Sequence, residues 1–324
     1  MTNVKRKPAS LMGAPISAQE CQELKAAFKE RYADQVPSVF LSKELILKSI
    51  EGLSNLSGII FSYGLNDAAV TTSRRITLVP TRNTTSGESA MIPVIDRNGY
   101  LSNNGERVDF EKFLTLSGNH VTDFKKAESE MSLTKLPKGY FWGINKILNM
   151  LNVENCNGLV FHFGYNIAMQ SPCRKFQSVL EAVDSNNASL NAFLEYGQCN
   201  PPCDIDPDSP SCVYTMIAEK FSEEAADRDL NLLRAFRDNW LLKQENGQAL
   251  FEMYYFLSPG IVDEINDSAD NEAIWEDLFK NEYSTLLNSI KQNKFEEAQS
   301  VYVQMMNNLK ERFLMQDAKS GVLI

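Results

Sequence analysis

Two histidines, His120 and His162, are the side chains in this 324-residue sequence whose ordinary pKa suits a general base at neutral pH. A cysteine–histidine or serine–histidine–aspartate nucleophilic site would have to use one of them. His162 lies in a strand-like run, on the face opposite Phe161 and Phe163, and we expect a structural or surface role. His120 follows Gly118 in a segment that reads as an exposed loop. The spacing supports no catalytic constellation, so we assign no catalytic or cofactor-binding residue.

Three cysteines cluster in the sequence at Cys199, Cys203 and Cys212, and they could supply three thiolates for zinc. Their spacing is loose, and no fourth cysteine or histidine lies near them. In a reducing compartment a disulfide is not expected there. We therefore expect thiols packed in a proline-stiffened linker and assign no metal ligand, while a thiol-based metal or redox sensor stays open. Cys21 and Cys156 fall within apolar patterns and should be buried and inert.

Other ligand motifs are weak. Asp204, Asp206 and Asp208 alternate as in a calcium loop, but Pro207 replaces a flexible position and no glutamate stands at the required end. The sequence holds no Walker-type loop and no Gly-x-Gly-x-x-Gly run. We therefore expect no cofactor.

Charge divides the chain into two parts. Residues 1–203 carry 21 Lys/Arg and 19 Asp/Glu, whereas residues 204–324 carry 11 and 23. Such a split indicates two separately folded parts, and the acidic part disfavours binding to a phosphate backbone. No apolar run approaches the roughly 18 to 20 residues that a membrane helix needs. The basic residues 5–7 precede no apolar stretch of the kind found in a secretory signal, so we expect a cytoplasmic protein with neither nucleic-acid binding nor membrane insertion.

An internal repeat is the most informative pattern. Residues 57–66 (SGIIFSYGLN) match residues 157–166 (NGLVFHFGYN), with identical Gly, Phe, Gly and Asn positions. We expect a helix before each copy, over 45–53 with Ser42 as its N-cap and over 141–151, and a strand after each, over 75–79 and 176–183. The glycines at 58 and 158 should end the helix-to-strand loops, where we expect a positive φ or close packing, and those at 64 and 164 should open the turns. The first strand alternates, which predicts one strongly apolar face.

A further helix is expected upstream of each copy. Ser17 and Glu20 form a capping-box pattern ahead of a stripe at Cys21, Leu24 and Phe28. For the second copy, the pattern predicts a helix over 123–131 capped by the threonine before it. Between the copies, residues 90–95 read as an edge strand, 96–99 as a turn and 102–108 as a loop.

After the proline-containing segment over 199–211, the pattern of apolar residues is helical. We expect a helix of about three turns from Val213, a second over 227–244, and an apolar face at 250–257. Ser258 and Pro259 read as the N-cap and first residue of another short helix. Apolar residues at helical spacing over 275–290 and 298–313 predict a final antiparallel helical hairpin.

These patterns predict an α+β fold: two tandem helix–strand–strand repeats followed by an all-α helical C-terminal domain. The expected parts are a disordered tail over 1–15, a first α+β repeat over 16–118, a second over 119–198, a Pro-rich linker over 199–211 and an acidic helical domain over 212–324.

Two segments resemble bacterial families that are uncharacterised. The motifs Gly58–Gly64 and Gly158–Gly164, with the tail Cys199–Cys203, resemble a helix–strand repeat with a Gly-Ile-Arg-x-Tyr-x-Gly-like strand and a Cys-Pro-Pro-x-Cys-like end. Ile60 and Val160 stand at the arginine position. Residues 233–238, 247 and 254–259 are similar to the segment called the CFI box, although Cys212-Val213-Tyr214 replaces its Cys-Phe-Ile. The resemblance implies an α+β repeat followed by a helical module, and brings no activity.

Our first hypothesis is a non-enzymatic protein-interaction or scaffold component of a bacterial assembly. The helical domain would bind another protein or copies of itself, because the aromatic residues Trp240, Trp275, Tyr283, Tyr302 and Phe313 exceed what a small core needs. Alternatives are an enzyme of unrecognised type with a site between the two repeats, and the thiol-based sensor at the linker cysteines.

Overall fold

The structure is a computed structural model that describes residues 9–83, 92–96, 98–129, 131, 136–169, 175–195, 197–200, 212–222 and 226–315. Backbone contacts divide the chain into two compact units. The α+β unit comprises Met1–Asn83, Gly87–Met91 and Asp96–Asp204, and the helical unit comprises Thr84–Ser86, Ile92–Ile95 and Ile205–Ile324. The division after Asp204 falls within the range predicted as a linker.

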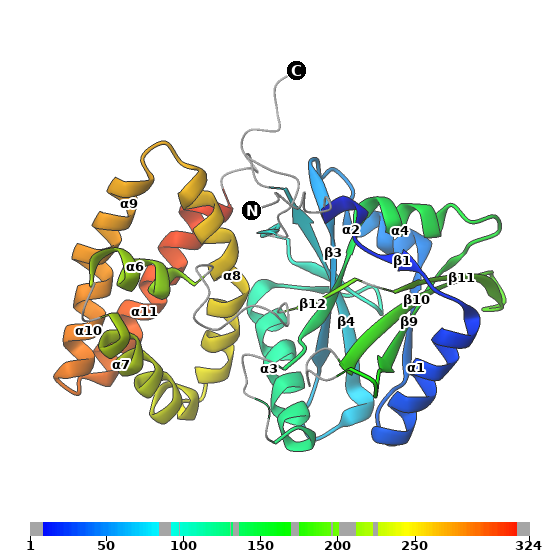
Figure 1. The fold of residues 1–324 in the computed structure, drawn as a ribbon, viewed down its shortest axis with the longest axis horizontal. Helices are drawn as coiled ribbons and strands as arrows, with labels where there is room; N and C mark the ends of the chain where they lie inside the picture. Colours follow the sequence, from blue (N-terminus) through cyan, green and yellow to red (C-terminus); the bar gives the residue numbers. More distant parts are fainter. Residues whose placement is uncertain are drawn as a thin grey trace. The chain divides into compact units, whose positions relative to one another are not determined.

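The α+β unit contains two antiparallel sheets (Figure 1). The first sheet has the order β1 (Ala14–Pro15), β11 (Ser189–Glu195), β10 (Phe176–Val183), β9 (Gly158–Tyr165), β2 (Ser38–Ser42). The second follows the path β12 (Gln198–Asn200), β8 (Gly139–Gly143), β3 (Leu56–Leu65), β4 (Arg74–Arg82), β6 (Tyr100–Ser102), β7 (Arg107–Val108). The chain therefore crosses between sheets: β2 comes from the first half but pairs with β9, and β8 comes from the second half but pairs with β3.

Four helices of this unit lie among the described residues. They are α1 (Ala18–Arg31), α2 (Lys43–Ser49), α3 (Phe110–Ala127) and α4 (Ile144–Leu151). The predicted capping box at Ser17 and Glu20 is confirmed, and so is the N-cap at Ser42, whose side chain accepts from the Leu45 amide. These bonds satisfy amide groups that the first helical turn leaves unpaired, and so fix where α1 and α2 begin.

Aromatic side chains fill the space between the two sheets. The rings of Phe61 and Phe161 stack at 5.9 Å, and those of Tyr63 and Phe163 meet edge to face at 5.2 Å. Trp142 on β8 is fully buried and contacts Phe61. One continuous apolar core thus joins both halves of the unit. Because β3 packs against this core and α3 also packs along it, nine of its ten residues are buried. The face of Ile59, Phe61 and Tyr63, which was predicted to be strongly apolar, lies in this core, and the other face of β3 is buried as well.

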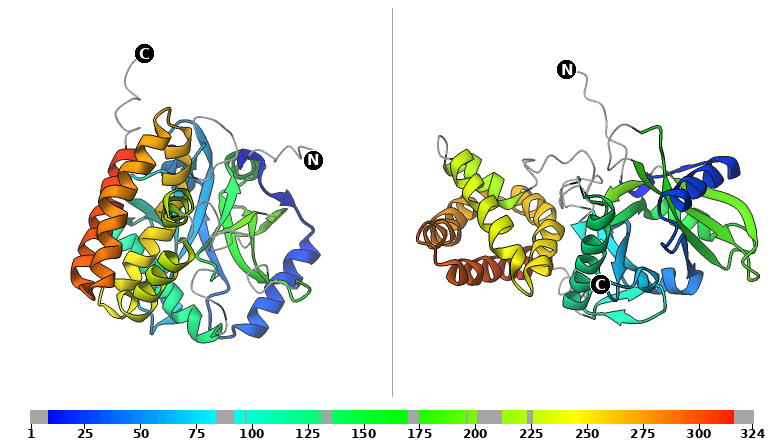
Figure 2. Two further views of the ribbon diagram at one scale, coloured as in Figure 1. Left: turned by 60° about the vertical axis from the view of Figure 1, so that its left-hand side comes forward. Right: turned by 90° about the horizontal axis from the view of Figure 1, so that it is seen from below.

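The helical unit is built from amphipathic helices. They are α6 (Val213–Phe221), α7 (Ala226–Asn239), α8 (Gly247–Asp267), α9 (Asn271–Leu278), α10 (Ser284–Lys291) and α11 (Phe295–Leu309). Short 3-10 and π turns stand at η4 (Leu241–Lys243), η5 (Phe279–Tyr283) and η6 (Lys310–Leu314). As predicted, α10 and α11 form a hairpin, and the two run side by side in Figure 2. The short segment β5 (Ile92–Pro93) is grouped with this unit, where Ile92 lies against Gly260 of α8.

Several predicted boundaries need correction. Residues 102–108 include parts of strands β6 and β7 around a turn, and the tail predicted over 1–15 contains the 3-10 turn η1 (Ala9–Leu11) and strand β1. The helix predicted over 141–151 begins only at Ile144, because Tyr140, Phe141 and Trp142 are strand residues paired with β3.

The helix predicted over 123–131 is the end of α3, which begins thirteen residues earlier than expected, at Phe110 after its N-cap Asp109. The boundary placed between residues 118 and 119 therefore cuts through a helix. Gly118 does not break α3 because the glycine is buried within it.

The helix break predicted at Ser258 and Pro259 is absent, because α8 continues through Pro259 to Asp267. The Ser258 hydroxyl instead accepts a hydrogen bond of 2.8 Å from the amide of Val213, at the start of α6. A serine can satisfy the exposed amides of another helix in this way as well as those of its own. Among the described residues, no helix is both long enough and apolar enough to span a bilayer.

Candidate functional site

His120 lies in α3 and is 1% exposed, which corrects its predicted position in an exposed loop. Its Nε2 donates to the carbonyl oxygen of Pro137 at 2.9 Å, so its Nδ1 is the acceptor that faces the Arg74 guanidinium at 3.4 Å. Burial, reinforced by the charge of Arg74, lowers the pKa of His120 to about 3. Both ring nitrogens are occupied and the ring is held neutral, so this histidine is not placed to take a proton from a substrate.

Arg74 is the buried charge beside this histidine. Burial lowers its pKa to about 10, and the nearby Asp123 carboxylate opposes that shift. The guanidinium donates to the amide oxygen of Gln35, whose nitrogen donates to Asp123 at 3.2 Å. The guanidinium also lies 4.8 Å from the centre of the Phe163 ring. The buried guanidinium is thus held by the Gln35 amide, which links it to Asp123, and by the face of the Phe163 ring. These contacts fix the packing between the two halves of the α+β unit.

His162 is buried on β9 and lies 2.6 Å from the Glu181 carboxylate on β10. The two residues are diagonal neighbours, two residues from directly opposite each other, since Val179 faces His162 and Glu181 faces Val160. The hydrogen bond from His162 lowers the pKa of Glu181. The structural role expected for His162 therefore has a physical basis in this cross-strand pair, which places a polar contact within the sheet.

The three clustered cysteines are only partly described. The side chain of Cys199 and all of Cys203 lie outside the described residues, as do Asp204, Asp206 and Asp208. Cys212 precedes α6, and its Sγ lies 2.6 Å from the Tyr254 hydroxyl, which also accepts from the Tyr214 amide. Within the described residues, no group of histidine, cysteine and acidic side chains has a metal-binding arrangement. Cys21 and Cys156 are buried as predicted, and burial raises the pKa of Cys21 to about 11.

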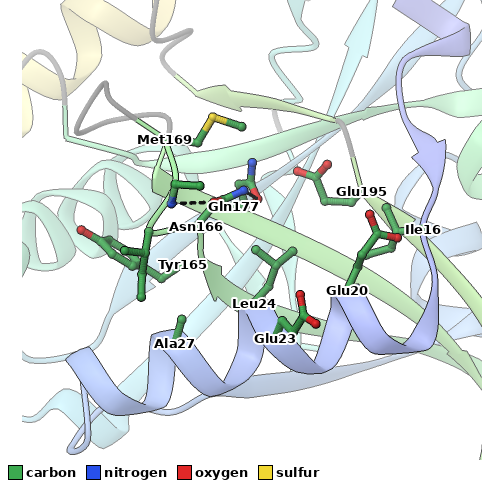
Figure 3. Close-up of a pocket in the computed structure, with 12 residues that line it drawn as sticks. Ile16, Glu20, Glu23, Leu24, Ala27, Tyr165, Asn166, Met169, Gln177 and Glu195 are labelled. Carbon is green, nitrogen blue, oxygen red and sulfur yellow. Dashed lines mark hydrogen bonds between the residues drawn. The ribbon is translucent and has the colours of Figure 1, made fainter.

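A hollow of about 360 Å³ lies beside α1 in the α+β unit (Figure 3). Residues on one face of α1 form one wall, the turn after β9 forms another, and β10 and β11 contribute the rest. The lining comprises Ile16, Glu20, Glu23, Leu24, Ala27, Tyr165, Asn166, Ile167, Ala168, Met169, Gln177 and Glu195. This volume is near the lower end of the range for small-ligand sites, about 300 to 1,000 Å³.

Among the described residues, three carboxylates and no basic side chain line this hollow. Glu20 is engaged with Ser17 in the capping box, which lowers its pKa. Glu195 is 2% exposed and accepts from the Tyr140 hydroxyl at 2.8 Å. Glu23 is exposed and accepts through Oε1 from Gln19. Glu23 is therefore the carboxylate best placed to meet a ligand.

The rest of the lining is apolar or neutral. Leu24 and Ala27 lie on the inner face of α1, and Ile167 in the turn after β9 is 69% exposed. Asn166 donates to the side-chain oxygen of Gln177 at 3.3 Å, which holds the turn to β10. The arrangement combines negative charge with an aliphatic wall, which suits an ammonium or guanidinium group on an alkyl stem.

A second acidic hollow, of about 350 Å³, lies in the helical unit. Its lining comprises Glu264, Asp267, Ser268, Asp270, Ile274, Arg312 and Phe313. Nearby on α8, burial raises the pKa of Asp263 to about 6, and the charge of Asp267 adds to the shift.

No family model, curated protein or solved structure matches this chain. The site must therefore be interpreted from its own residues. Sequence reasoning found the helix that carries Glu20, Glu23 and Leu24 but missed the hollow, because Glu195 and Ile167 reach it only through the pairing of β9, β10 and β11.

Proposed function

We propose that the protein is a non-enzymatic protein-interaction or scaffold component that acts in a bacterial cytoplasm and recognises a basic segment of another protein. The observation that carries this proposal is the hollow beside α1, where Glu23 and an aliphatic wall lie next to the exposed side chain of Ile167. A lysine or arginine of a partner would bury its aliphatic stem against Leu24 and place its charged group near Glu23.

The proposed surface differs from the one first expected. Trp275, Tyr283 and Tyr302 are buried within the helical unit, so they are part of its core and not of a binding face. The large apolar side chains that are exposed among the described residues (Leu11, Phe40, Leu47, Val70 and Ile167) all belong to the α+β unit. The acidic hollow that includes Phe313 keeps the final hairpin as a second candidate surface for the same kind of partner.

The enzyme alternative placed a site between the two repeats, and that space is where the aromatic core of Phe61, Phe161 and Trp142 packs. We do not carry that site forward. The thiol-based alternative rests on Cys199 and Cys203, whose side chains lie outside the described residues, so nothing favours it over the interaction proposal.

The tandem-repeat organisation is part of the proposal, and equivalent contacts support it. Gly58 lies opposite Gly143 with the Phe141 ring over it, and Gly158 lies opposite Ser42 with the Phe40 ring over it. The backbone around these positions also agrees, because both Asn55 and Asn155 adopt a positive φ, at 54° and 63°.

The second glycine of each motif is also in an equivalent place. A Cβ on Gly64 would meet Leu116 of α3, and one on Gly164 would meet Leu24 of α1. The motif glycines therefore serve close packing, which was one of the two roles expected for Gly58 and Gly158. Gly64 and Gly164 do not open turns as expected, because β3 and β9 each continue for one more residue. On this reading each half is a helix–strand–helix–strand–strand unit, and the two exchange their first strands.

A titration with a small basic probe tests the proposed function. The full chain would be titrated with the peptide acetyl-Leu-Lys-Leu-amide while methyl NMR signals of Leu24, Ala27 and Ile167 are followed. We expect shifts at these methyls that diminish with added salt, and none with acetyl-Leu-Glu-Leu-amide, because exposed ion pairs are screened.

Glu23→Gln should weaken binding by up to about fivefold, the upper range for one exposed ion pair. Glu30→Gln is the matched control, because Glu30 is exposed on the same helix but does not line the hollow. Equal responses to the lysine and glutamate peptides, or shifts confined to other parts of the chain, would refute the assignment.

A further inference from the structure

Strand β2 is an edge of the first sheet, and its outer side is open among the described residues. Its inner side pairs with β9, where the carbonyl of Pro37 accepts from Phe163 and the amide of Lys43 donates to Asn157. By the alternation of an antiparallel ladder, the amide and carbonyl groups of Ser38 and Phe40 and the amide of Ser42 point outward. In the part of the chain that the structure describes, no strand pairs with this side of β2.

The molecule itself shows how such an edge is covered. β8 stands against β3 in the register that β2 has against β9, and two segments cover the outer side of β8. β12 pairs with it antiparallel, so that Gln198 faces Phe141, and the amide of Gly143 donates to the carbonyl of Met12 at 3.0 Å. The place on β2 that corresponds to Phe141 is Phe40, which is 38% exposed.

The sequence of β2 lacks the features that usually protect an edge. Edge strands are commonly blocked by a charged residue, a proline or a bulge, and Ser-Val-Phe-Leu-Ser contains no charge and no proline. The segment also reads nearly the same in both directions. An antiparallel partner centred on Phe40 would place Ser38 opposite Ser42 and Val39 opposite Leu41.

We propose that the β2 edge is a self-association surface that pairs antiparallel with β2 of a second copy of this chain. The axis passes between the two Phe40 residues, so the interface is isologous, as closed two-fold dimers require. The two first sheets then form one continuous sheet across the dimer, and the exposed Phe40 rings become a cross-strand pair.

The register fixes the hydrogen bonds of this interface. Phe40 exchanges amide-to-carbonyl bonds with its copy, and each Ser42 amide donates to the carbonyl of the other Ser38, about four bonds in all. The carbonyl of Ser42 takes no part, because an N-cap carbonyl accepts the first bond of its own helix, here α2. An interface of this size is small, so the dimer should be weak and concentration-dependent. It does not involve the hollow beside α1, and either proposal can fail without the other.

Sedimentation equilibrium of the full chain, up to concentrations on the order of 0.1 mM, tests the association. We expect the mass to rise towards twice that of the chain with concentration. Phe40→Lys should abolish the rise by placing two like charges opposite each other. Leu47→Lys is the control, because Leu47 is as exposed as Phe40, at 40%, but lies outside the strand on α2.

Disulfide trapping tests the register. Phe40→Cys should form a covalent dimer with itself under mild oxidation, whereas Ser38→Cys should do so only weakly, because Ser38 faces Ser42 of the other copy. Circular dichroism and hydrogen exchange would verify that each variant is folded. A mass that stays that of one chain at all concentrations overturns the proposal, as does an association that survives Phe40→Lys or equal trapping at positions 38 and 40.

Discussion

Gly58 and Gly158 give the sharpest test of how the two halves of the α+β unit are built. A Cβ at Gly58 would overlap the carbonyl oxygen of Trp142 and the Phe141 ring, both on the interior strand β8. A Cβ at Gly158 would lie 2.5 Å from the carbonyl oxygen of Leu41 and 2.7 Å from the Phe40 ring, on the edge strand β2. Each alanine substitution must therefore move a neighbouring strand.

The two substitutions should differ in size for a physical reason. β8 is held between β3 and β12 and cannot shift without straining both pairings, so we expect Gly58→Ala to lower the free energy of unfolding by about 3 kcal/mol. In the described part of the chain β2 pairs on one side only, and Phe40 is partly exposed, so the ring can swing away. Gly158→Ala should therefore cost about 1 to 2 kcal/mol.

Gly105→Ala is the control for the loss of glycine itself. Gly105 has a φ of +83° and open space around it, so alanine there should cost about 1 kcal/mol through backbone strain alone. Urea denaturation would be followed by hydrogen exchange of peptides from β3 and β9, which reports on the α+β unit separately from the helical unit. If Gly58→Ala were no more costly than Gly105→Ala, our account of the motif glycines as close-packing positions would be wrong.

Three further substitutions test single contacts. Asp263→Asn should stabilise the helical unit at pH 7. The pKa of Asp263 is raised to about 6 in the folded state, so ionisation of this carboxyl opposes folding increasingly from about pH 4 to 6. A rise of about two pKa units, discounted for partial exposure, corresponds to about 1 to 2 kcal/mol. Thermal melts at pH 7 and pH 3 should show the gain only at pH 7. Ser258→Ala should cost about 1 kcal/mol by leaving the amide of Val213 unpaired, and a matching loss of hydrogen-exchange protection at the start of α6 checks the cause. Glu181→Gln should make the stability of the α+β unit fall less steeply as the pH is lowered. The hydrogen bond from His162 lowers the pKa of Glu181 in the folded state, so the stability that the carboxylate contributes is lost as the pH falls below the ordinary pKa of a glutamate. Urea midpoints between pH 6 and 3 that fall as steeply in the variant as in the unmodified chain would contradict this.

Local signals predicted much of the secondary structure. The capping box at Ser17 and Glu20, the N-cap at Ser42, the strand over 176–183 and the final helical hairpin all depend on residues close together in sequence, and all are present. The overall class, mixed α and β with helices at the C-terminal end, follows from these elements.

Errors arose where tertiary contacts replaced local rules. α3 could have been recognised from its apolar stripe at Phe113, Leu116, Val121 and Phe124, but Gly118 and its polar neighbours suggested a loop. Inside α3, Ser117, Gly118 and His120 are buried, and their packing outweighs their weak helix propensity.

Two features could not be predicted from the sequence: the exchange of β2 and β8 between the two sheets, and the acidic hollow beside α1. Each depends on which distant strands pair: β11, which carries Glu195, pairs with β10 on one side and with β1, the strand before α1, on the other.

The proposed function predicts a specific partner, and affinity recovery of the tagged full chain from the cells that naturally produce it tests this most directly. The native mass of the recovered particle and its co-eluting proteins would be determined for the unmodified chain, Glu23→Gln and Glu30→Gln. We expect a protein with a basic segment, in stoichiometric amount, that is retained by Glu30→Gln and reduced by Glu23→Gln. Recovery of the chain with no stoichiometric protein, or a partner held equally by both variants, would contradict a scaffold that binds through the hollow beside α1.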